Sequence, residues 1–370
     1  MPHLETFILT QFKNYDYQIV ECSSKLNCFV GLNGMGKTNL LDAIYYLCMG
    51  KSYFNSSDQH NVQKGQEFLR LEGHFKLDEK VEKIVVKVIP RKRKEVERNE
   101  VAYKKLSEHV GLLPIVIIAP DDTSIVYEGS EARRKFLDNT ISQLDQHYLQ
   151  DLIHYNKILK QRNASLKQFA LNKYFDSKLI DIYDQQLIEP AQRIFEKRLA
   201  FCQAFDPVLQ QFYANISNEQ EKIGCQYKSS LAEGNYAQAL AAGREKDRVL
   251  QRTSLGIHRD DLNFSINTYL LRRYASQGQL KSFVISLKLA QYQMLKVEKK
   301  RSPILLLDDI FDKLDLNRVT HLLKLLLRGS FGQIFLTDTH EQRIEQIVQN
   351  FESNYQRYLV VNGTLKKLSN

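Results

Sequence analysis

The stretch that decides the fold is Gly31-Leu32-Asn33-Gly34-Met35-Gly36-Lys37-Thr38, which matches the phosphate-binding P-loop pattern G-x-x-x-x-G-K-[ST]. Glycines let the backbone turn so that several N–H groups converge on phosphate oxygens. In this pattern the lysine reaches the β- and γ-phosphates and the threonine hydroxyl takes a position on Mg²⁺. A helix that begins near Lys37 directs its positive end at the same phosphates.

The residues on either side of this stretch support the P-loop interpretation. Lys25 to Val30 is a short apolar run that predicts a buried strand leading into the loop, and Asn39 to Leu47 has apolar residues at helical spacing. The alternative is a glycine-rich turn that matches the pattern by chance. Strand, loop and helix stand in the order that the motif requires, which favours the phosphate site.

A second motif, Pro303-Ile304-Leu305-Leu306-Leu307-Asp308-Asp309, is an apolar strand that ends in two acids, the Walker B form. Asp308 is expected to hold Mg²⁺ opposite Thr38, and Asp309 to orient or activate the attacking water. Two acids after a buried strand also serve as a helix cap. The P-loop upstream favours the metal role, and it makes Lys37 and Asp309 the expected catalytic residues.

Two further polar segments are candidate phosphate contacts only because the chain also has a P-loop. Ser276-Gln277-Gly278-Gln279 opens an amphipathic helix and offers a hydroxyl and backbone N–H groups to an anion, although serine is also an ordinary helix cap. Gln333 to His340 predicts one more buried strand with a polar end. From there either Thr337 or His340 could approach the γ-phosphate, and a surface histidine is an equally good interpretation.

Composition restricts the class of protein. The 370 residues carry a net charge of +9 with a pI near 9.1, which suits a partner such as nucleic acid but does not by itself require one. No apolar run is long enough for a membrane span, and the first residues lack a signal-peptide layout. Five scattered cysteines without a C-x-x-C motif indicate free thiols in a reducing compartment, which we take as the cytoplasm.

The order of patterns along the chain predicts an α/β fold with a helical insertion. Strand-like patterns occupy residues 1–128 and 251–370, which we assign to one discontinuous head, and residues 129–250 read as a mostly helical second lobe. Pro190 and Pro207 are expected to kink or divide a long helix in that lobe. Arg91-Lys92-Arg93-Lys94 follows a predicted hairpin, either as a solvated turn or as a phosphate-neutralising contact to DNA.

These motifs together resemble the RecF family, bacterial recombination-repair ATPases related to the SMC and ABC-type ATPases. Besides the P-loop and Walker B residues, the resemblance rests on segments in family order along the whole chain, namely Phe12 to Tyr15, Pro120 to Asp122, Gly129, Arg133 to Asp138, Lys160 to Asn163, Gly256 to Leu262 and Ser276 to Gln279. Asn39, directly after Lys37 and Thr38, is similar to the RecF and SMC form rather than to transporter ATPases.

The resemblance implies an ABC-type head in which two chains sandwich ATP and Mg²⁺. Gly31 to Asn39 would bind the nucleotide with help from Lys13 and Asn14, which the residues alone suggest to be an ordinary turn. Ser276 to Gln279 of one chain would complete, in trans, the site on Lys37 of the other. Weak, DNA-stimulated hydrolysis would release this ATP-dependent homodimer.

The resemblance also implies partners, namely double-stranded DNA and single-strand/double-strand junctions, together with RecR, RecO and RecA in replication-gap repair. It implies a nucleoid-associated location. Phe54 stands where the family often has arginine, and Ile257 where it usually has proline, so local contacts there depart from the pattern. The alternative function is an ABC-type ATPase that drives a partner other than DNA, and a third is a DNA-binding scaffold with an inactive nucleotide site.

Overall fold

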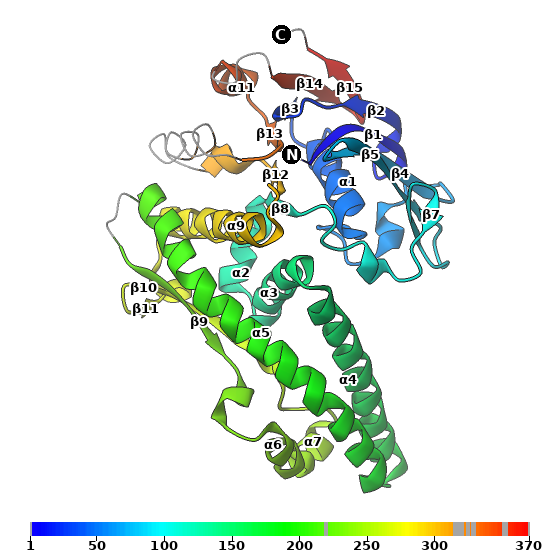
Figure 1. Cartoon of the computed structure of the whole chain (residues 1–370), viewed down its shortest axis with the longest axis vertical. Coiled ribbons are helices and arrows are strands. Elements are labelled where there is room, and N and C mark those ends of the chain that lie inside the picture. Colours follow the sequence, from blue (N-terminus) through cyan, green and yellow to red (C-terminus); the bar gives the residue numbers. More distant parts are fainter. Residues whose placement is uncertain are drawn as a thin grey trace. The chain divides into compact units, whose positions relative to one another are not determined.

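The computed structural model describes residues 2–217, 221–313, 322, 326, 331–349 and 354–368 (Figure 1). The chain forms two compact units. Unit 1 contains Met1–Asp122, Asn215–Asn218 and Lys281–Asn370, and unit 2 contains Thr123–Ala214 and Glu219–Leu280. The head and lobe boundaries expected at residues 128/129 and 250/251 stay a prediction. The main difference from the compact units concerns residues 251–280, which we assign to the head and which lie in unit 2.

Unit 1 contains a six-stranded, mostly parallel sheet with the strand order β15-β14-β3-β13-β12-β8. Only β15 runs antiparallel to its neighbour; the other pairs are parallel. The strands are β3 (Leu26–Val30), β8 (Ile115–Ile118), β12 (Ile304–Leu307), β13 (Ile334–Asp338), β14 (Tyr355–Val361) and β15 (Thr364–Lys367). Every residue of β3, β8, β12 and β13 is buried, which explains their continuous apolar runs.

A second six-stranded sheet in unit 1 is antiparallel and has the order β2-β1-β4-β5-β6-β7. Its strands are β1 (His3–Phe12), β2 (Tyr15–Glu21), β4 (Leu69–Leu77), β5 (Lys80–Val88), β6 (Glu95–Arg98) and β7 (Val101–Ala102). Helix α1 (Lys37–Met49) contacts strands of both sheets, and most of its residues are buried. The apolar sequence of this helix therefore follows from its place in the core (Figure 1).

Short elements complete unit 1. They are η1 (Asp58–Asn61), η2 (Leu106–Glu108), η3 (Pro120–Thr123, whose last residue belongs to unit 2), η6 (Ile310–Lys313) and α11 (Glu341–Val348). Helix α9 (Gln277–Lys299) begins in unit 2 and continues into unit 1 at Lys281. No helix among the described residues is long and apolar enough to cross a membrane.

Unit 2 combines long helices with a small antiparallel sheet of order β11-β10-β9. Its strands are β9 (Ile223–Lys228), β10 (Asp261–Ile266) and β11 (Tyr269–Leu270). Its helices are α2 (Ser124–Tyr127), α3 (Ser130–Leu144), α4 (Gln146–Asn172), α5 (Ser177–Ser217, which ends in unit 1), α6 (Tyr236–Ala242), α7 (Arg244–Leu250) and α8 (Leu271–Tyr274), with η4 (Ser230–Glu233) and η5 (Ile257–Arg259) between them. In Figure 1, α4 and α5 run side by side as the longest helices of this unit.

The structure differs from the expected elements in three places. Pro190 and Pro207 lie inside α5 without dividing it. Near the end of the lobe expected to be mostly helical, the chain forms two short helices, α6 and α7, separated at Gly243. Strand β9 lies in the stretch expected to be helical, where it pairs with β10 from Ile223 to Lys228.

Candidate functional site

Sheet topology brings the two sequence motifs of unit 1 together. Strands β3, β13 and β12 are parallel neighbours, so their carboxyl ends lie at the same edge of the sheet. The P-loop follows β3, Asp308 and Asp309 follow β12, and Thr337 stands near the end of β13 between them. Open parallel sheets place ligands at this carboxyl edge.

The P-loop backbone has the shape that its glycines allow. Gly34 and Gly36 have φ angles of 80° and 111°, a left-handed region that glycine enters without a steric penalty. Lys37 is buried, and its Nζ donates hydrogen bonds to the carbonyl oxygens of Gly31 at 2.9 Å and Leu32 at 3.2 Å. The loop thus holds its own lysine where the motif needs a cation.

Asn14, in the turn between β1 and β2, hydrogen-bonds to the P-loop and to the start of α1. The Asn14 amide donates to the Met35 carbonyl at 3.1 Å and accepts from Asn39 Nδ2 at 2.7 Å. A Cβ added to Gly36 would stand 2.4 Å from Asn14 Nδ2, so this close packing requires glycine. The Gly363 N–H, in the β14–β15 turn, donates to the same Met35 carbonyl at 3.2 Å.

Thr337 joins the two acids of the Walker B motif. Its hydroxyl donates to Asp308 Oδ1 at 2.8 Å and accepts the Asp309 N–H at 2.9 Å. On the other side of Asp308, the Thr38 hydroxyl lies 3.0 Å from both carboxylate oxygens. One carboxylate and one hydroxyl therefore face each other, as the sequence analysis expects for a Mg²⁺ site.

Both Walker B acids have unusual properties at this edge of the sheet. Burial, opposed by the Thr337 and Thr38 hydrogen bonds and reinforced by the Asp309 charge, raises the pKa of Asp308 to about 6. Asp309 Oδ2 lies 3.9 Å from Lys37 Nζ, and Asp309 has a φ of 42°. A left-handed non-glycine residue is uncommon, and such residues cluster at functional sites.

Lys13, expected beside the nucleotide, lies against a buried acid instead. Its Nζ is 2.6 Å from Asp42 Oδ2, and Asp42 is completely buried on α1. The same carboxylate accepts the Ser52 hydroxyl and the Tyr53 N–H, each at 2.7 Å. In this structure Lys13 therefore connects the β1–β2 turn to α1 and to the segment after it.

A neighbouring buried triad was not predicted, although its member Asp122 lies in one of the segments that carry the family resemblance. Lys288 Nζ lies 2.9 Å from Asp122 Oδ1 and 2.9 Å from the Tyr53 hydroxyl, and Tyr53 also donates to Asp122. Lys288 and Asp122 are each 3% exposed. A lysine among the apolar residues of α9 is the one sequence signal that marked this site.

The other candidate residues lie elsewhere. In unit 2, Ser276 and Gln279 form a capping box, because Ser276 N–H donates to Gln279 Oε1 at 2.6 Å and Gln279 N–H to Ser276 Oγ at 3.2 Å; Ser276 and Gln277 are exposed. In unit 1, His340 is exposed at the start of α11. Arg91, Lys92 and Arg93 are exposed between β5 and β6, whereas Lys94 pairs with Asp58 at 3.0 Å.

The fold and the carboxyl-edge site define the ATP-binding head of an ABC-type ATPase. The model of the RecF/RecN/SMC N-terminal domain matches residues 3–364. The chain belongs to the RecF family. It is 45% identical over 360 residues to the DNA replication and repair protein RecF of Flavobacterium johnsoniae, covering 97% of this chain and 99% of that protein. Identity to RecF of Parabacteroides distasonis is 42% over 365 residues, which cover 99% of each.

Solved structures place the fold in the same family. The chain matches the recombination mediator protein RecF bound to ATP, in the RecFOR pathway, with a TM-score of 0.87 and 31% identity over 99% of both chains. An Smc head bound to the C-winged helix domain of ScpA matches with a TM-score of 0.58 at 15% identity, covering 100% of this chain and 97% of the other, which shows the shared fold alone. The expected α/β class, an ABC-type head with a helical insertion, is therefore confirmed.

Proposed function

We propose that this chain is an ATP-dependent DNA-binding protein of recombinational repair and replication-gap processing. The observation that carries the proposal is the carboxyl-edge cluster of Lys37, Thr38, Asp308, Asp309 and Thr337, whose members contact one another through hydrogen bonds and an ion pair. RecF relatives named for DNA replication and repair, and RecF structures with ATP in the RecFOR pathway, support this function.

ATP binding would use the P-loop from Gly31 to Asn39. Lys37 and the loop N–H groups would hold phosphate oxygens, since those N–H groups belong to a helix N-terminus with glycines at the required turns. Asn14 would act by fixing the loop and Asn39 rather than by touching nucleotide. Lys13 would keep Asp42 neutralised beside α1.

Mg²⁺ would be held by Thr38 and Asp308. The donor set fits, because Mg²⁺ prefers oxygen ligands and both side chains present oxygens at the same edge. The ion would polarise the phosphates, and Asp309 would orient the attacking water. The Thr337 hydroxyl would keep the Asp308 carboxylate and the Asp309 backbone in register.

A second copy of the chain would complete the site in trans. The Ser276 hydroxyl and Gln277 are exposed at the N-terminus of α9, and an exposed helix N-terminus suits a phosphate. ATP would thus drive head dimerisation on DNA, and weak DNA-stimulated hydrolysis would reset the dimer. RecR, RecO and RecA are the partners that the family relationship suggests, with action at the nucleoid in the cytoplasm.

The exposed cations Arg91, Lys92 and Arg93 are proposed DNA contacts in unit 1. Lys94 is the weakest member of the group because its charge is already paired with Asp58. Phosphate contacts of this kind are sequence-independent and sensitive to salt.

The test is the native mass of the protein with and without ATP and Mg²⁺, repeated with a short DNA duplex. We expect a monomer that dimerises only with ATP and binds duplex more tightly in that state. A mass that ATP does not change, or duplex binding that ATP does not affect, would contradict the gated dimer. A Lys37→Arg variant, which should neither dimerise nor hydrolyse ATP, ties the effect to the P-loop.

A further inference from the structure

A loop of unit 2 is fixed by side chains from the surrounding helices and from β9 at almost every residue. It comprises Thr253 to Asp261, joins α7 to β10 and includes η5. We call it the clamped loop. It contains Gly256 to Asp261 of the Gly256 to Leu262 motif, which the proposed function leaves without a role.

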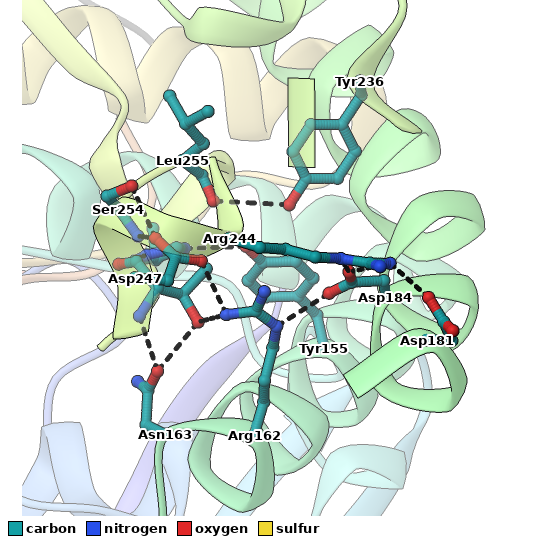
Figure 2. Close-up of polar contacts among 12 residues, drawn as sticks. Tyr155, Arg162, Asn163, Asp181, Asp184, Tyr236, Arg244, Asp247, Ser254 and Leu255 are labelled. Atoms are coloured by element: carbon teal, nitrogen blue, oxygen red, sulfur yellow. Dashed lines mark hydrogen bonds and ion pairs between the residues drawn. The ribbon is translucent and has the colours of Figure 1, made fainter. Parts of the chain in front are cut away.

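Helix α4 fixes the first half of the clamped loop (Figure 2). Arg162 is completely buried, and its Nη1 donates to Thr253 Oγ1 at 2.9 Å and to Asp247 Oδ2 at 2.7 Å. Asn163 accepts the Thr253 N–H at 2.8 Å, and the other Asp247 oxygen accepts the Ser254 N–H at 2.8 Å.

Arginines of two other helices fix the second half. Arg198 of α5 is 1% exposed and donates to the Ile257 carbonyl at 2.8 Å and to Asp260 Oδ2 at 2.7 Å. Arg133 of α3 donates through Nε and Nη2 to the two oxygens of Asp261, at 2.6 Å and 3.1 Å. Asp260 and Asp261 therefore have a structural role.

The turn between these halves is equally constrained. The Tyr155 hydroxyl bonds His258 Nδ1 at 2.7 Å, and the Thr253 carbonyl accepts from His258 Nε2 at 3.1 Å. Gly256 has a φ of 128°, and a Cβ there would stand 2.4 Å from the Tyr155 hydroxyl. Any other residue would push the turn away from its partners.

Arg259 is the exception in the clamped loop. It is exposed, and within the part of the chain that the structure describes its guanidinium donates no hydrogen bond and forms no ion pair. Arg134 is similar, since its described partners are the Ser130 hydroxyl at 2.6 Å and the Asp260 carbonyl at 2.8 Å, both uncharged. Both arginines lie close enough to His258 to lower its pKa, an effect smaller than that of burial.

The carboxylates nearest this pair form their own ion pairs with other arginines. Asp138 and Asp260 both bond Arg198, and Asp261 bonds Arg133 in bidentate fashion. Among the described residues, Arg134 and Arg259 thus have no ion pair of their own, although three aspartates stand near them. Burying charged side chains such as Arg198 and Asp260 has a large desolvation cost. A contribution to stability alone therefore hardly explains this cluster of arginines and aspartates. The hydrogen bonds of Ile257, His258 and Asp260 fix the backbone on either side of the exposed Arg259.

We propose that Arg259, with Arg134 beside it, binds a phosphate oxyanion, and that this phosphate belongs to the DNA backbone. The inference rests on the proposed function and adds a second contact surface, on unit 2, to the cations of unit 1. A guanidinium fork on a preorganised turn suits phosphate oxygens better than a mobile lysine. The same chemistry would also suit a phosphate of ATP held by a second copy.

The primary test compares Arg259→Gln with Arg259→Lys and with the control Arg248→Gln, an exposed arginine on α7. Duplex affinity is measured with ATP and Mg²⁺ over a range of salt concentrations. We expect Arg259→Gln to bind about tenfold more weakly, with the slope of log K against log salt smaller by about one. Arg259→Lys should restore part of the affinity, and Arg248→Gln should behave as wild type.

Separate arms distinguish the source of the phosphate. An unchanged DNA slope combined with a weaker ATP-driven dimer would assign the contact to nucleotide and overturn the DNA assignment. If Arg259→Gln changes neither, the phosphate site is wrong. Unchanged thermal unfolding of the variant is required for each conclusion, and protection of Arg259 in the wild-type protein decides the question if the glutamine variant unfolds early.

A direct probe separates failure of this inference from failure of the proposed function. Phenylglyoxal modifies accessible arginines, and the Arg259 peptide can be followed by mass spectrometry with duplex, ATP or inorganic pyrophosphate present. Protection of Arg259 by duplex but not of Arg248 would support the proposal. If wild-type protein neither binds DNA nor dimerises, the proposed function fails; pyrophosphate protection would then retain the oxyanion site, and its absence would remove it.

Discussion

At the scale of single residues, the Thr337 hydroxyl matters because both Walker B acids depend on it. The sequence suggested that Thr337 or His340 approaches the γ-phosphate. In the structure Thr337 is fully buried and bonded to Asp308 and to the Asp309 backbone, while His340 is exposed. The strand end was predictable from its apolar run, but the bridging role depends on β13 lying between β3 and β12, which local patterns do not encode.

Thr337→Val keeps the shape of the side chain and removes its hydrogen bonds. Because Asp308 and the Asp309 N–H would each lose a partner, we expect unfolding free energy to fall by about 1–3 kcal/mol. The variant should also hydrolyse ATP about tenfold more slowly, because a misplaced Asp308 and Asp309 would raise the barrier to hydrolysis by about 1.4 kcal/mol. Steady-state ATPase rates and ATP affinity provide the measurement. The neighbouring Thr339→Val is the control, and equal effects from both variants would contradict the bridging role.

His258 should make unit 2 sensitive to acid. Burial, assisted by Arg259 and Arg134, lowers its pKa to about 4, against about 6.5 in an unfolded chain. Between these values the unfolded state binds a proton that the folded state does not, so stability falls as pH drops. From pH 7 to pH 5 we expect a loss of about 2 kcal/mol from this residue.

His258→Gln keeps a donor for the Thr253 carbonyl and cannot be protonated. Urea unfolding at pH 7 and pH 5 should therefore show a pH-dependent loss smaller by about 2 kcal/mol than in wild type. The exposed His154→Gln serves as the control. The same pH dependence in wild type and His258→Gln would show that His258 is not responsible.

At the scale of secondary-structure elements, periodicity predicted most strands and helices but not their interruptions. Helix α5 continues through two prolines because each removes one main-chain hydrogen bond, whereas Ile180, Leu187, Ile194 and Leu209 remain completely buried along the helix. Strand β9 was missed because its partner β10 lies far along the chain. In α5, packing of the buried face outweighed the helix-breaking preference of proline. In β9, pairing with β10 outweighed the helical character of the surrounding sequence.

Helix α9 is tied to η3 inside unit 1 by the buried pair of Lys288 and Asp122. Lys288→Met should lower the unfolding free energy by about 3–5 kcal/mol, since it leaves a buried carboxylate without its cation. Adding Asp122→Asn should recover part of that loss. A double-mutant cycle by urea unfolding gives the coupling, and strictly additive effects would mean that the two side chains act independently.

At the scale of the whole molecule, the chain carries a net charge of +9. In the proposed sandwich, Ser276 to Gln279 serve the P-loop of the second copy and not that of their own chain. The resemblance in sequence predicted the family, which the comparisons confirm. The buried supports, such as Asp42 under Lys13 and Arg198 under the clamped loop, were not predictable. They join residues far apart in sequence through side chains whose types alone indicate a surface location.

Ser276→Arg should abolish ATP-dependent dimerisation while leaving ATP binding by the monomer unchanged. Serine caps α9 at an exposed position, and an arginine there would place bulk and charge where the partner's nucleotide is proposed to lie. Native mass with ATP and Mg²⁺, alongside equilibrium ATP binding, gives the answer. A dimer that persists in this variant would remove the trans arrangement, and lost ATP binding would show that the substitution disturbs the fold.

The position of β3 also constrains how the protein is made. Residues 26–30 pair on one side with residues 334–338 and on the other with residues 355–359. Ribosomes add about 5–20 residues per second, so the P-loop strand waits about 15–60 s for its first neighbour in the sheet. During that interval an apolar strand lacks both flanks and is open to chaperones or to mispairing. We therefore expect ATP to be held only by chains that contain residues 334–338 and 355–359, so fragments truncated before these strands should not occupy DNA as ATP-loaded heads.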